Sequence, residues 1–291
     1  RFGLPLGADI CQSCGLVYTN PRFSETMLPH FYQHHYHELT FGKQKAGEQL
    51  TPRSTIFPRI EPFLPEKRTL TFFEVGAASG YILEGLKVSA QRRAYRVRLF
   101  GTEHSPELVE EGKKRGIRLY QRSLPEIRDT IEKPVDVLIL SHVLEHFYDP
   151  FDDLSILQDM MSTDGIVYVE VPGLLALRKQ WGVYECDYLK YRTAAHMFDF
   201  TLASLSRMLR QAGFRRLCGD EYIHAVFRKG SFTGSRSELS PRNTVSEHKG
   251  KRAYRETLGY LSNLEKCRFI CILLHQNMSY RRKLLALAGN L

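Results

Sequence analysis

One short segment, residues 71–80, constrains the fold of this chain more than any other part of the sequence. It reads Thr-Phe-Phe-Glu-Val-Gly-Ala-Ala-Ser-Gly, an apolar run that ends in an acid and then breaks into small residues. A stretch with helical character begins at Tyr81. This order is typical of a buried parallel strand that turns sharply into a helix, where α/β sheets bind nucleotide-like ligands. Glycine and alanine allow the backbone to approach such a ligand closely.

Four later segments continue an alternation of strands and helices, as expected of a doubly wound sheet. The first of them ends at Glu103, and a carboxylate at the tip of a second strand accepts hydrogen bonds from ribose hydroxyls. Ser105 and Pro106 are typical of the start of a helix, and Gly116 of its end. The strand segments are 97–103, 116–123, 135–140 and 165–173.

The loop and two later segments resemble class I S-adenosylmethionine-dependent methyltransferases, over roughly residues 70 to 230. The loop resembles that family's E/D-x-G-x-G-x-G motif, with Ala78 in place of the middle glycine. Residues 140–150 resemble its hVLEHxxDP segment, and residues 165–173 its fifth strand, although Gly173 stands where the family usually has asparagine. A dinucleotide dehydrogenase is the competing interpretation of the loop. Ala78 and the His142–His146 segment, which has no counterpart in dehydrogenases, argue against it.

The resemblance implies an α/β fold, a Rossmann-like, doubly wound sheet of seven strands in the order 3-2-1-4-5-7-6. An antiparallel hairpin of residues 214–218 and 223–228 would close the sheet. The resemblance also implies S-adenosyl-L-methionine as the cofactor, with Glu103 at its ribose and Ser123 near its adenine. The residues expected to bind the cofactor are Glu74, Gly76, Ala77, Ala78, Gly80, Glu103, His104, Ser123 and His142.

His142, Glu145 and His146 follow the fourth strand, where an acceptor substrate would enter. Their spacing puts the three side chains on one face if the segment forms a helical turn. Three interpretations stay open: His146 is a general base, the three side chains ligate a divalent metal, or their roles are structural. The metal interpretation draws on the E-x-x-E-H positions of the ubiquinone-pathway O-methyltransferases, and His142 stands where that pattern has glutamate.

His196 is the second catalytic candidate. Its segment resembles the family's H-x-x-x-F stretch, which precedes the helix that covers the substrate mouth, here residues 202–212 with Thr201 as N-cap. His196 either faces the acceptor as a base or lid contact, or is a hydrogen-bonded structural residue. We therefore expect His146 and His196 to be the catalytic residues. Three tyrosines of the preceding insertion either pack it, which is favoured, or line an acceptor site: Tyr184, Tyr188 and Tyr191.

Near the N-terminus, Cys11 and Cys14 form a C-x-x-C followed by Gly15, the geometry of a zinc knuckle. The stretch resembles the second half of a zinc ribbon that precedes many bacterial methyltransferase domains. Zinc is therefore a second candidate cofactor, with Cys11 and Cys14 as its ligands. A structural zinc needs four ligands, so the others either lie upstream of Arg1 or come from nearby histidines: His30, His34, His35 and His37.

The chain has 291 residues, of which 43% are hydrophobic, enough for one large α/β domain with additions. No stretch approaches the roughly 18 apolar residues of a membrane span, and no signal peptide is recognisable. Six cysteines without regular spacing indicate a reducing compartment, so we expect a cytoplasmic protein. Because the chain starts at Arg1 rather than Met, we expect it to be trimmed or incomplete.

We expect four parts: a zinc-knuckle-like segment (1–40), a methyltransferase domain (41–230), a polar linker (231–250) and a helical extension (251–291). The extension carries eight basic residues against two acidic ones, within a net charge of +9. An apolar stripe runs along it from Tyr260 to Met278, which indicates docking on the parent domain or pairing in a homodimer. Binding to a membrane surface is the less favoured interpretation.

The sequence therefore predicts methyl transfer to a small or medium acceptor, with a hydroxyl of a sugar or glycan intermediate favoured. The sugar part rests on the resemblance, because proteins that join a zinc ribbon to such a domain often belong to polysaccharide pathways. RNA methylation is the alternative that the basic extension suggests, but the chain has no N/D-P-P-Y/F motif. A non-catalytic scaffold is a third hypothesis, and it predicts loss of the Glu74 loop or of Glu103, which are both intact.

Overall fold

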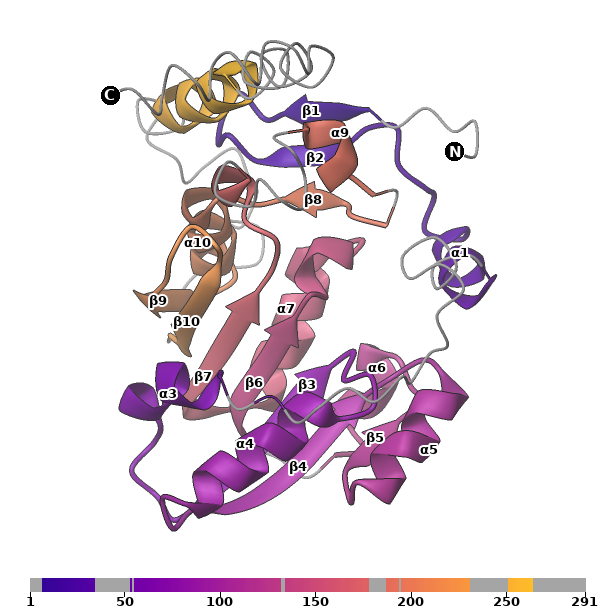
Figure 1. Ribbon diagram of the computed structural model, residues 1–291, viewed down its shortest axis with the longest axis vertical. Helices are drawn as coiled ribbons and strands as arrows, with labels where there is room; N and C mark the ends of the chain where they lie inside the picture. The colour runs from indigo at the N-terminus through magenta and orange to yellow at the C-terminus, as the bar shows by residue number, and fades with distance from the viewer. Residues whose placement is uncertain are drawn as a thin grey trace, which may run out of the picture.

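The computed structural model describes residues 7–34, 53, 55–131, 134–177, 187–193, 195–230 and 251–263. Within these ranges the chain forms one seven-stranded sheet with helices on both faces, and a separate three-stranded sheet (Figure 1). The small sheet lies on the side to which the carboxyl ends of β6 and β7 point (Figure 1).

The large sheet has the strand order β5-β4-β3-β6-β7-β10-β9. Numbered along the chain within this sheet, the order is 3-2-1-4-5-7-6, so the predicted topology is confirmed. β10 runs antiparallel to both β7 and β9, and the other neighbouring pairs are parallel. The strands are β3 (Thr69–Val75), β4 (Arg96–Thr102), β5 (Arg118–Tyr120), β6 (Val135–Ser141), β7 (Met161–Glu170), β9 (Phe214–Cys218) and β10 (His224–Lys229).

Both faces of this sheet are buried, because successive residues of a strand point to opposite sides. Phe72 packs in the apolar cluster under α3, α4 and α5, whereas its neighbour Phe73 packs in the cluster under α6, α7 and α10. The sheet is therefore the middle of three layers. The helices are α3 (Phe57–Ile60), α4 (Tyr81–Gln91), α5 (Pro106–Lys114), α6 (Leu124–Arg128), α7 (Pro150–Met160) and α10 (Leu202–Gln211).

The helix ends follow the capping signals of the sequence. Ser105 Oγ accepts the N–H of Leu108 at 3.4 Å, and α5 ends just before Gly116, whose φ is +71°. Thr201 Oγ1 accepts the N–H of Ser204 at 3.0 Å at the start of α10. These side chains satisfy N–H groups that a helix start otherwise leaves unpaired.

The small sheet joins the N-terminus to the second half of the chain. β1 (Ala8–Ile10) and β2 (Val17–Thr19) form an antiparallel hairpin, and β2 also pairs with β8 (Phe198–Asp199). A helix over residues 251–263 lies beside the hairpin (Figure 1), and its Thr257 donates a hydrogen bond to Gly15 O at 3.3 Å. The hairpin is thus contacted by β8 along one edge and by the 251–263 helix at its turn.

Apolar side chains from other parts of the chain pack against this sheet. Val17 packs with Leu174, Leu177 and Tyr191 in a third apolar cluster, and Tyr260 of the 251–263 helix packs against it. The described end of the basic extension therefore contacts its own chain. The short helices are α1 (Leu28–His34), η1 (Glu61–Phe63), η2 (Leu144–His146), η3 (Leu174–Ala176) and α9 (Tyr188–Tyr191).

Several sequence predictions fall outside the described residues. They concern the boundaries near residues 40 and 250, the 231–250 linker, Tyr184 and the apolar stripe beyond residue 263. No helix in the described ranges is long and apolar enough to cross a membrane.

Candidate active site

The loop between β3 and α4 has a backbone that few residues adopt. The φ angle is +64° at Gly76, +47° at Ala78 and +74° at Gly80. This left-handed region is unstrained for glycine and costs an alanine about 1–2 kcal/mol. A Cβ on Gly80 would also lie 3.1 Å from the side chain of Ile117. The small residues of the motif therefore serve a turn that brings the start of α4 beside the end of β3.

Glu103 follows β4 and contacts this loop directly. Its Oε2 accepts the N–H of Ala78 at 2.9 Å, and its Oε1 accepts those of His104 and Ser105 at 2.7 and 2.9 Å. An ionised carboxylate offers about four acceptor positions, so capacity for a ligand hydroxyl remains. The predicted residues Ala78, Glu103 and His104 thus lie together, whereas Ser123 is exposed and caps the start of α6.

Glu74 is the buried acid at the end of β3. Its side chain is 1% exposed, and its Oε2 has no hydrogen-bond partner among the described residues. Burial and the charge of Glu103 raise the pKa of Glu74, and Arg53 opposes this rise. A buried acid without a partner is costly unless a donor or cation compensates it, so this position calls for a ligand.

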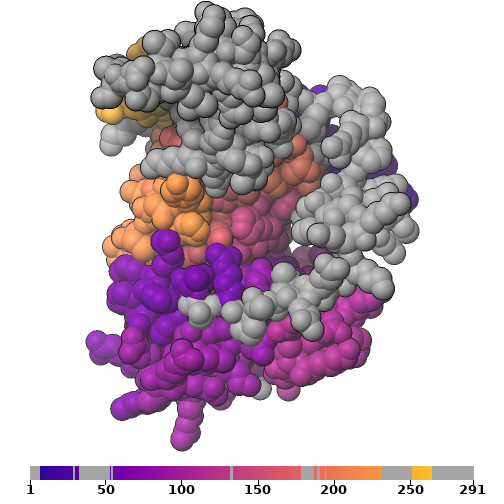
Figure 2. All heavy atoms as spheres, viewed as in Figure 1, coloured from indigo at the N-terminus to yellow at the C-terminus, as the bar shows by residue number. Residues whose placement is uncertain are grey.

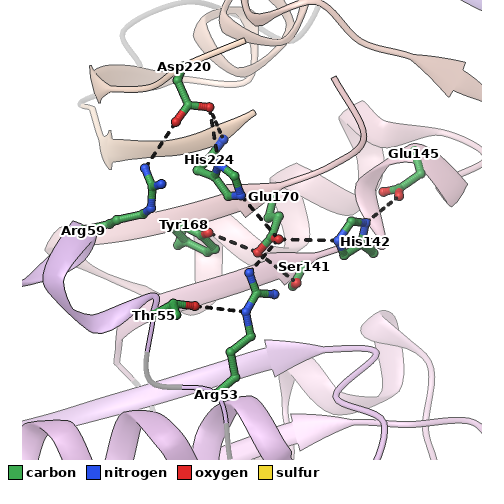
Figure 3. Close-up of polar contacts among 10 residues, drawn as sticks. All are labelled: Arg53, Thr55, Arg59, Ser141, His142, Glu145, Tyr168, Glu170, Asp220 and His224. Carbon is green, nitrogen blue, oxygen red and sulfur yellow. Dashed lines mark hydrogen bonds and ion pairs between the residues drawn. The ribbon is translucent and has the colours of Figure 1, made fainter. Parts of the chain in front are cut away.

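At the end of β7, which is separated from β3 by β6, several side chains converge on Glu170 (Figure 3). Arg53 Nη2 lies 2.8 Å from Glu170 Oε1, and the Nε2 atoms of His142 and His224 lie 3.5 and 3.6 Å from it. Tyr168 donates its hydroxyl to Glu170 Oε2 at 3.1 Å. Burial alone would raise the pKa of Glu170, but the histidines and Arg53 hold it well below its usual range.

His142 departs from the predicted helical turn. Its φ is +54°, and the short helix η2 begins only at Leu144. The imidazole lies between two acids, with Nδ1 3.7 Å from Glu145 Oε1. Burial opposes protonation of this ring, but Glu145 and Glu170 raise its pKa to about 9. His142 is therefore a cation at neutral pH and not a base.

Glu145, His146 and His196 form a second cluster beside the first. Glu145 is 1% exposed, and neither of its carboxylate oxygens has a hydrogen-bond partner in the described chain. His146 Nδ1 lies 2.9 Å from Ala195 O, so it carries the proton and Nε2 carries the lone pair. The rings of His146 and His196 are 5.0 Å apart. Burial lowers the pKa of His196 to about 4, which keeps this imidazole neutral.

These three residues also satisfy a geometric requirement for a metal site. One ligand atom from each lies within 4.8 Å of the others, and no other group of three such side chains does so in the described ranges. Two imidazoles and a carboxylate are a donor set that divalent transition metals accept. The set differs from the predicted one, because His196 replaces His142.

The N-terminal hairpin supports the position of His196. Arg192 Nη2 donates to Thr19 Oγ1 at 2.6 Å, and Thr19 in turn donates to His196 O. On the other side, Met197 N donates to Glu145 O at 2.7 Å. β2 and η2 therefore hold the segment that carries His196 between them.

A family model described as a methyltransferase domain matches residues 48–218, more than half of the chain. The chain belongs to this methyltransferase family. The strand order and the loop geometry make it a class I enzyme, whose cofactor is S-adenosylmethionine. A search of the curated proteins finds no match.

Two solved structures are similar to this chain at low identity. An S-adenosylmethionine-dependent methyltransferase from Archaeoglobus fulgidus is 17% identical, covering 68% of this chain and 85% of that one, with a TM-score of 0.41. The 1,6-didemethyltoxoflavin-N1-methyltransferase of Burkholderia thailandensis is 14% identical, covering 74% and 96%, with a TM-score of 0.48. The second structure holds S-adenosylhomocysteine and 1,6-didemethyltoxoflavin.

The residues of the loop fit this cofactor. Glu74 Oε2, which has no hydrogen-bond partner among the described residues, suits an ammonium group, and Glu103 retains acceptor capacity for ribose hydroxyls. Glycine or alanine at residues 76–78 keeps the loop free of larger side chains.

The zinc prediction rests on the knuckle alone. Cys11 N donates to Leu16 O at 2.8 Å and Gly15 N to Cys11 O at 2.7 Å, a tight turn that carries both thiols. Burial raises the pKa of the Cys14 thiol to about 11. No third ligand joins Cys11 and Cys14 among the described side chains, and those of His34, His35 and His37 lie outside them.

Three residues of the two clusters were not singled out from the sequence: Arg53, Glu170 and His224. An acid at the end of an apolar strand is a usable signal for Glu170, as it was for Glu74. Arg53 and His224 carry no periodic or motif signal. The pairing of His224 with Glu170 follows from the register of β10 on β7.

Proposed function

We propose that this enzyme transfers a methyl group to a hydroxyl of a polyhydroxylated acceptor, of the sugar or glycan class. The observation that carries the proposal is the polarity of the second cluster. Both oxygens of Glu145 and Nδ1 of His196 are buried and have no hydrogen-bond partner in the described chain. A ligand with several O–H donors satisfies such a site, whereas a ligand that only accepts hydrogen bonds does not.

His146 is the proposed general base. The Ala195 carbonyl fixes the proton on Nδ1, so Nε2 is the nitrogen that takes the acceptor's proton. The Glu145 carboxylate, 4.0 Å from Nε2, stabilises the imidazolium that forms. The cofactor supplies an activated methyl group: the new C–O bond forms as the C–S bond breaks, leaving S-adenosylhomocysteine. His196, held neutral by burial, accepts a hydrogen bond from a second hydroxyl.

The test is a set of nucleotide sugars and glycan fragments, with release of S-adenosylhomocysteine measured for the wild type and for His146→Asn. Asparagine keeps a donor near Ala195 O and removes the basic Nε2. We expect kcat to fall by roughly 10²–10⁴-fold while the affinity for S-adenosylhomocysteine stays unchanged. An unchanged kcat would remove His146 from the mechanism.

A divalent cation is the second candidate role for the same cluster, since Glu145, His146 and His196 meet the distance requirement. Dialysis against a chelator, followed by addition of Mg²⁺, Mn²⁺ or Zn²⁺, separates the two roles. Activity that is lost on chelation and recovered with an added metal ion would favour the metal role. Activity that neither treatment changes would favour the general-base role.

RNA remains the alternative acceptor. Of the basic extension, residues 251–263 pack on the chain's own knuckle, and Arg252 pairs with Glu256 at 2.8 Å. A filter-binding titration with structured RNA at two salt concentrations tests it, because phosphate contacts weaken steeply with salt.

A further inference from the structure

The strand β4 extends farther than its neighbour β5 at the outer edge of the large sheet. Gly116, with a φ of +71°, forms the turn after α5, so β5 starts only at Arg118 and pairs with β4 from Phe100 onward. Within the described ranges, residues 96–99 therefore have a strand partner on the β3 side alone. Figure 1 shows the start of β4 leading away from β5. An open strand edge is a template for pairing with another strand.

The backbone of this edge faces outward at Val97. Arg96 N donates to Arg68 O on the β3 side, at 2.8 Å. Glu103 N donates to Tyr120 O on the opposite, β5 side, at 3.0 Å. Because successive residues of a strand direct their N–H and C=O groups to opposite sides, the odd-numbered residues of β4 face the β5 side. No described β5 residue pairs with Val97, so its N–H and C=O face the open edge.

The short length of β5 leaves an open cleft of about 420 Å³ beside this edge. The lining of the cleft includes three basic side chains and, among the described residues, no acidic one. Arg98 and Arg118 are exposed, and Lys87 of α4 is half-buried. Three apolar residues also line the cleft: Val97, Leu99 and Phe100. The cleft therefore offers apolar contact and positive charge together.

The surface around the cleft is basic as well. Residues 85–102 include five basic residues and no acidic one. Three of the five form no ion pair with any described residue: Lys87, Arg92 and Arg96. In Figure 2 the purple and magenta residues of this end form the lower part of the visible face, and separate side chains project from it. Like charges disfavour pairing between two copies of this edge, whereas the same charges attract an acidic strand.

We propose that this cleft binds an extended acidic segment of a partner protein, which adds to the edge of β4 as a further strand. The backbone of the segment pairs with Val97, and carboxylates at every second position lie on the face that carries Arg98 and Arg118. These two arginines share a face. Arg98 is two residues before Phe100, and the Arg118 guanidinium lies 5.6 Å from the centre of the Phe100 ring.

The cleft lies away from the cofactor site, so a docked partner leaves that site open. Val97 is six residues before Glu103, which is about 20 Å along an extended strand. RNA is another polyanion that a basic surface attracts, but its backbone has no N–H groups to pair with a strand edge. The open backbone edge and the apolar lining therefore favour a peptide.

The test uses two fluorescein-labelled octapeptides of the same composition, glutamate and threonine in equal number, in alternating or in block order. Fluorescence anisotropy is expected to show that the wild type binds the alternating peptide more than tenfold more tightly than the block peptide. Arg118→Glu should weaken binding of the alternating peptide more than tenfold. Val97→Pro should do the same, because it removes the outward N–H without removing a bond to β3. The matched control is Arg210→Glu, the same charge change on an exposed position of α10, which should alter neither affinity.

All four proteins are expected to bind S-adenosylhomocysteine equally, which confirms that the variants are folded. Failure of the alternating peptide to bind the wild type, or equal affinity for the two peptides, would overturn the assignment. So would an unchanged affinity in both Arg118→Glu and Val97→Pro. A single-stranded RNA octamer is the third probe. RNA binding that Arg118→Glu weakens and Val97→Pro does not, without binding of the alternating peptide, would make the cleft a phosphate site and not a site of strand addition.

Discussion

Replacing Glu103 by alanine tests the cofactor site at its most connected residue. The carboxylate accepts three N–H groups at 2.7–2.9 Å, from Ala78, His104 and Ser105. A hydrogen bond to a charged group contributes about 1.5–3 kcal/mol when no water replaces it. The N–H of His104 is exposed and will find water, so we expect the contacts with Ala78 and Ser105, which are partly buried, to affect stability.

The expected loss of folding free energy is therefore about 1–3 kcal/mol for each of two partly buried N–H groups. The loss on binding is separate, because the same carboxylate is proposed to accept ribose hydroxyls. We expect the affinity for S-adenosylhomocysteine to fall more than tenfold, which corresponds to at least about 1.4 kcal/mol.

The assay is calorimetric titration of S-adenosylhomocysteine, combined with a thermal melt of each protein. Glu107→Ala is the control, since Glu107 is exposed and contacts the side chain of Ser105 without touching the loop. A Glu103→Ala protein that melts normally and binds S-adenosylhomocysteine within threefold of the wild type would refute the assignment.

Three further predictions follow from particular contacts. Gly85→Ala should lower the melting temperature, because its Cβ would lie 2.2 Å from the backbone oxygen of Arg53, and this clash outweighs the ~1 kcal/mol that alanine contributes to helix propensity. Thr19→Val should cost about 1–3 kcal/mol in denaturant unfolding, because buried Arg192 loses its hydroxyl partner. Burial and neighbouring acids raise the pKa of the Asp153 carboxyl to about 6, above its value of 3.8 in the unfolded chain. The folded state therefore binds this proton more tightly, and the free energy of unfolding falls as the pH rises from about 4 to about 6. Asp153→Asn should therefore melt higher than the wild type at pH 7.5 and equally at pH 4, and equal melting at both pH values would contradict this.

The sequence predicts the sheet order because its signals are local. Ser105, Gly116 and Thr201 mark helix ends through contacts with residues only a few positions away, and these contacts form as expected. The predicted last strand, residues 223–228, begins one residue before β10 (His224–Lys229). Ile223 has a φ of +56° and donates to Asp220 O, so it belongs to the turn before β10.

The site is less predictable because long-range contacts assemble it. His146 and His196 are 50 positions apart, and the bond between Met197 N and Glu145 O brings them together. His142 leaves the expected face because its N–H donates to Glu170 O at 2.7 Å, which imposes the left-handed backbone. Neither contact can be predicted from the spacing of residues along the chain.

The most direct test of the account is the transfer of a ¹³C-labelled methyl group from S-adenosylmethionine to a hydroxylated sugar acceptor, followed by NMR of the product. The chemical shift of the new methyl group distinguishes oxygen, nitrogen and carbon as the methylated atom. We predict an O-methyl product with the wild type and almost none with His146→Asn, although that variant still binds S-adenosylhomocysteine. An N-methyl or C-methyl product, or O-methylation at the same rate in the variant, would contradict the proposed function.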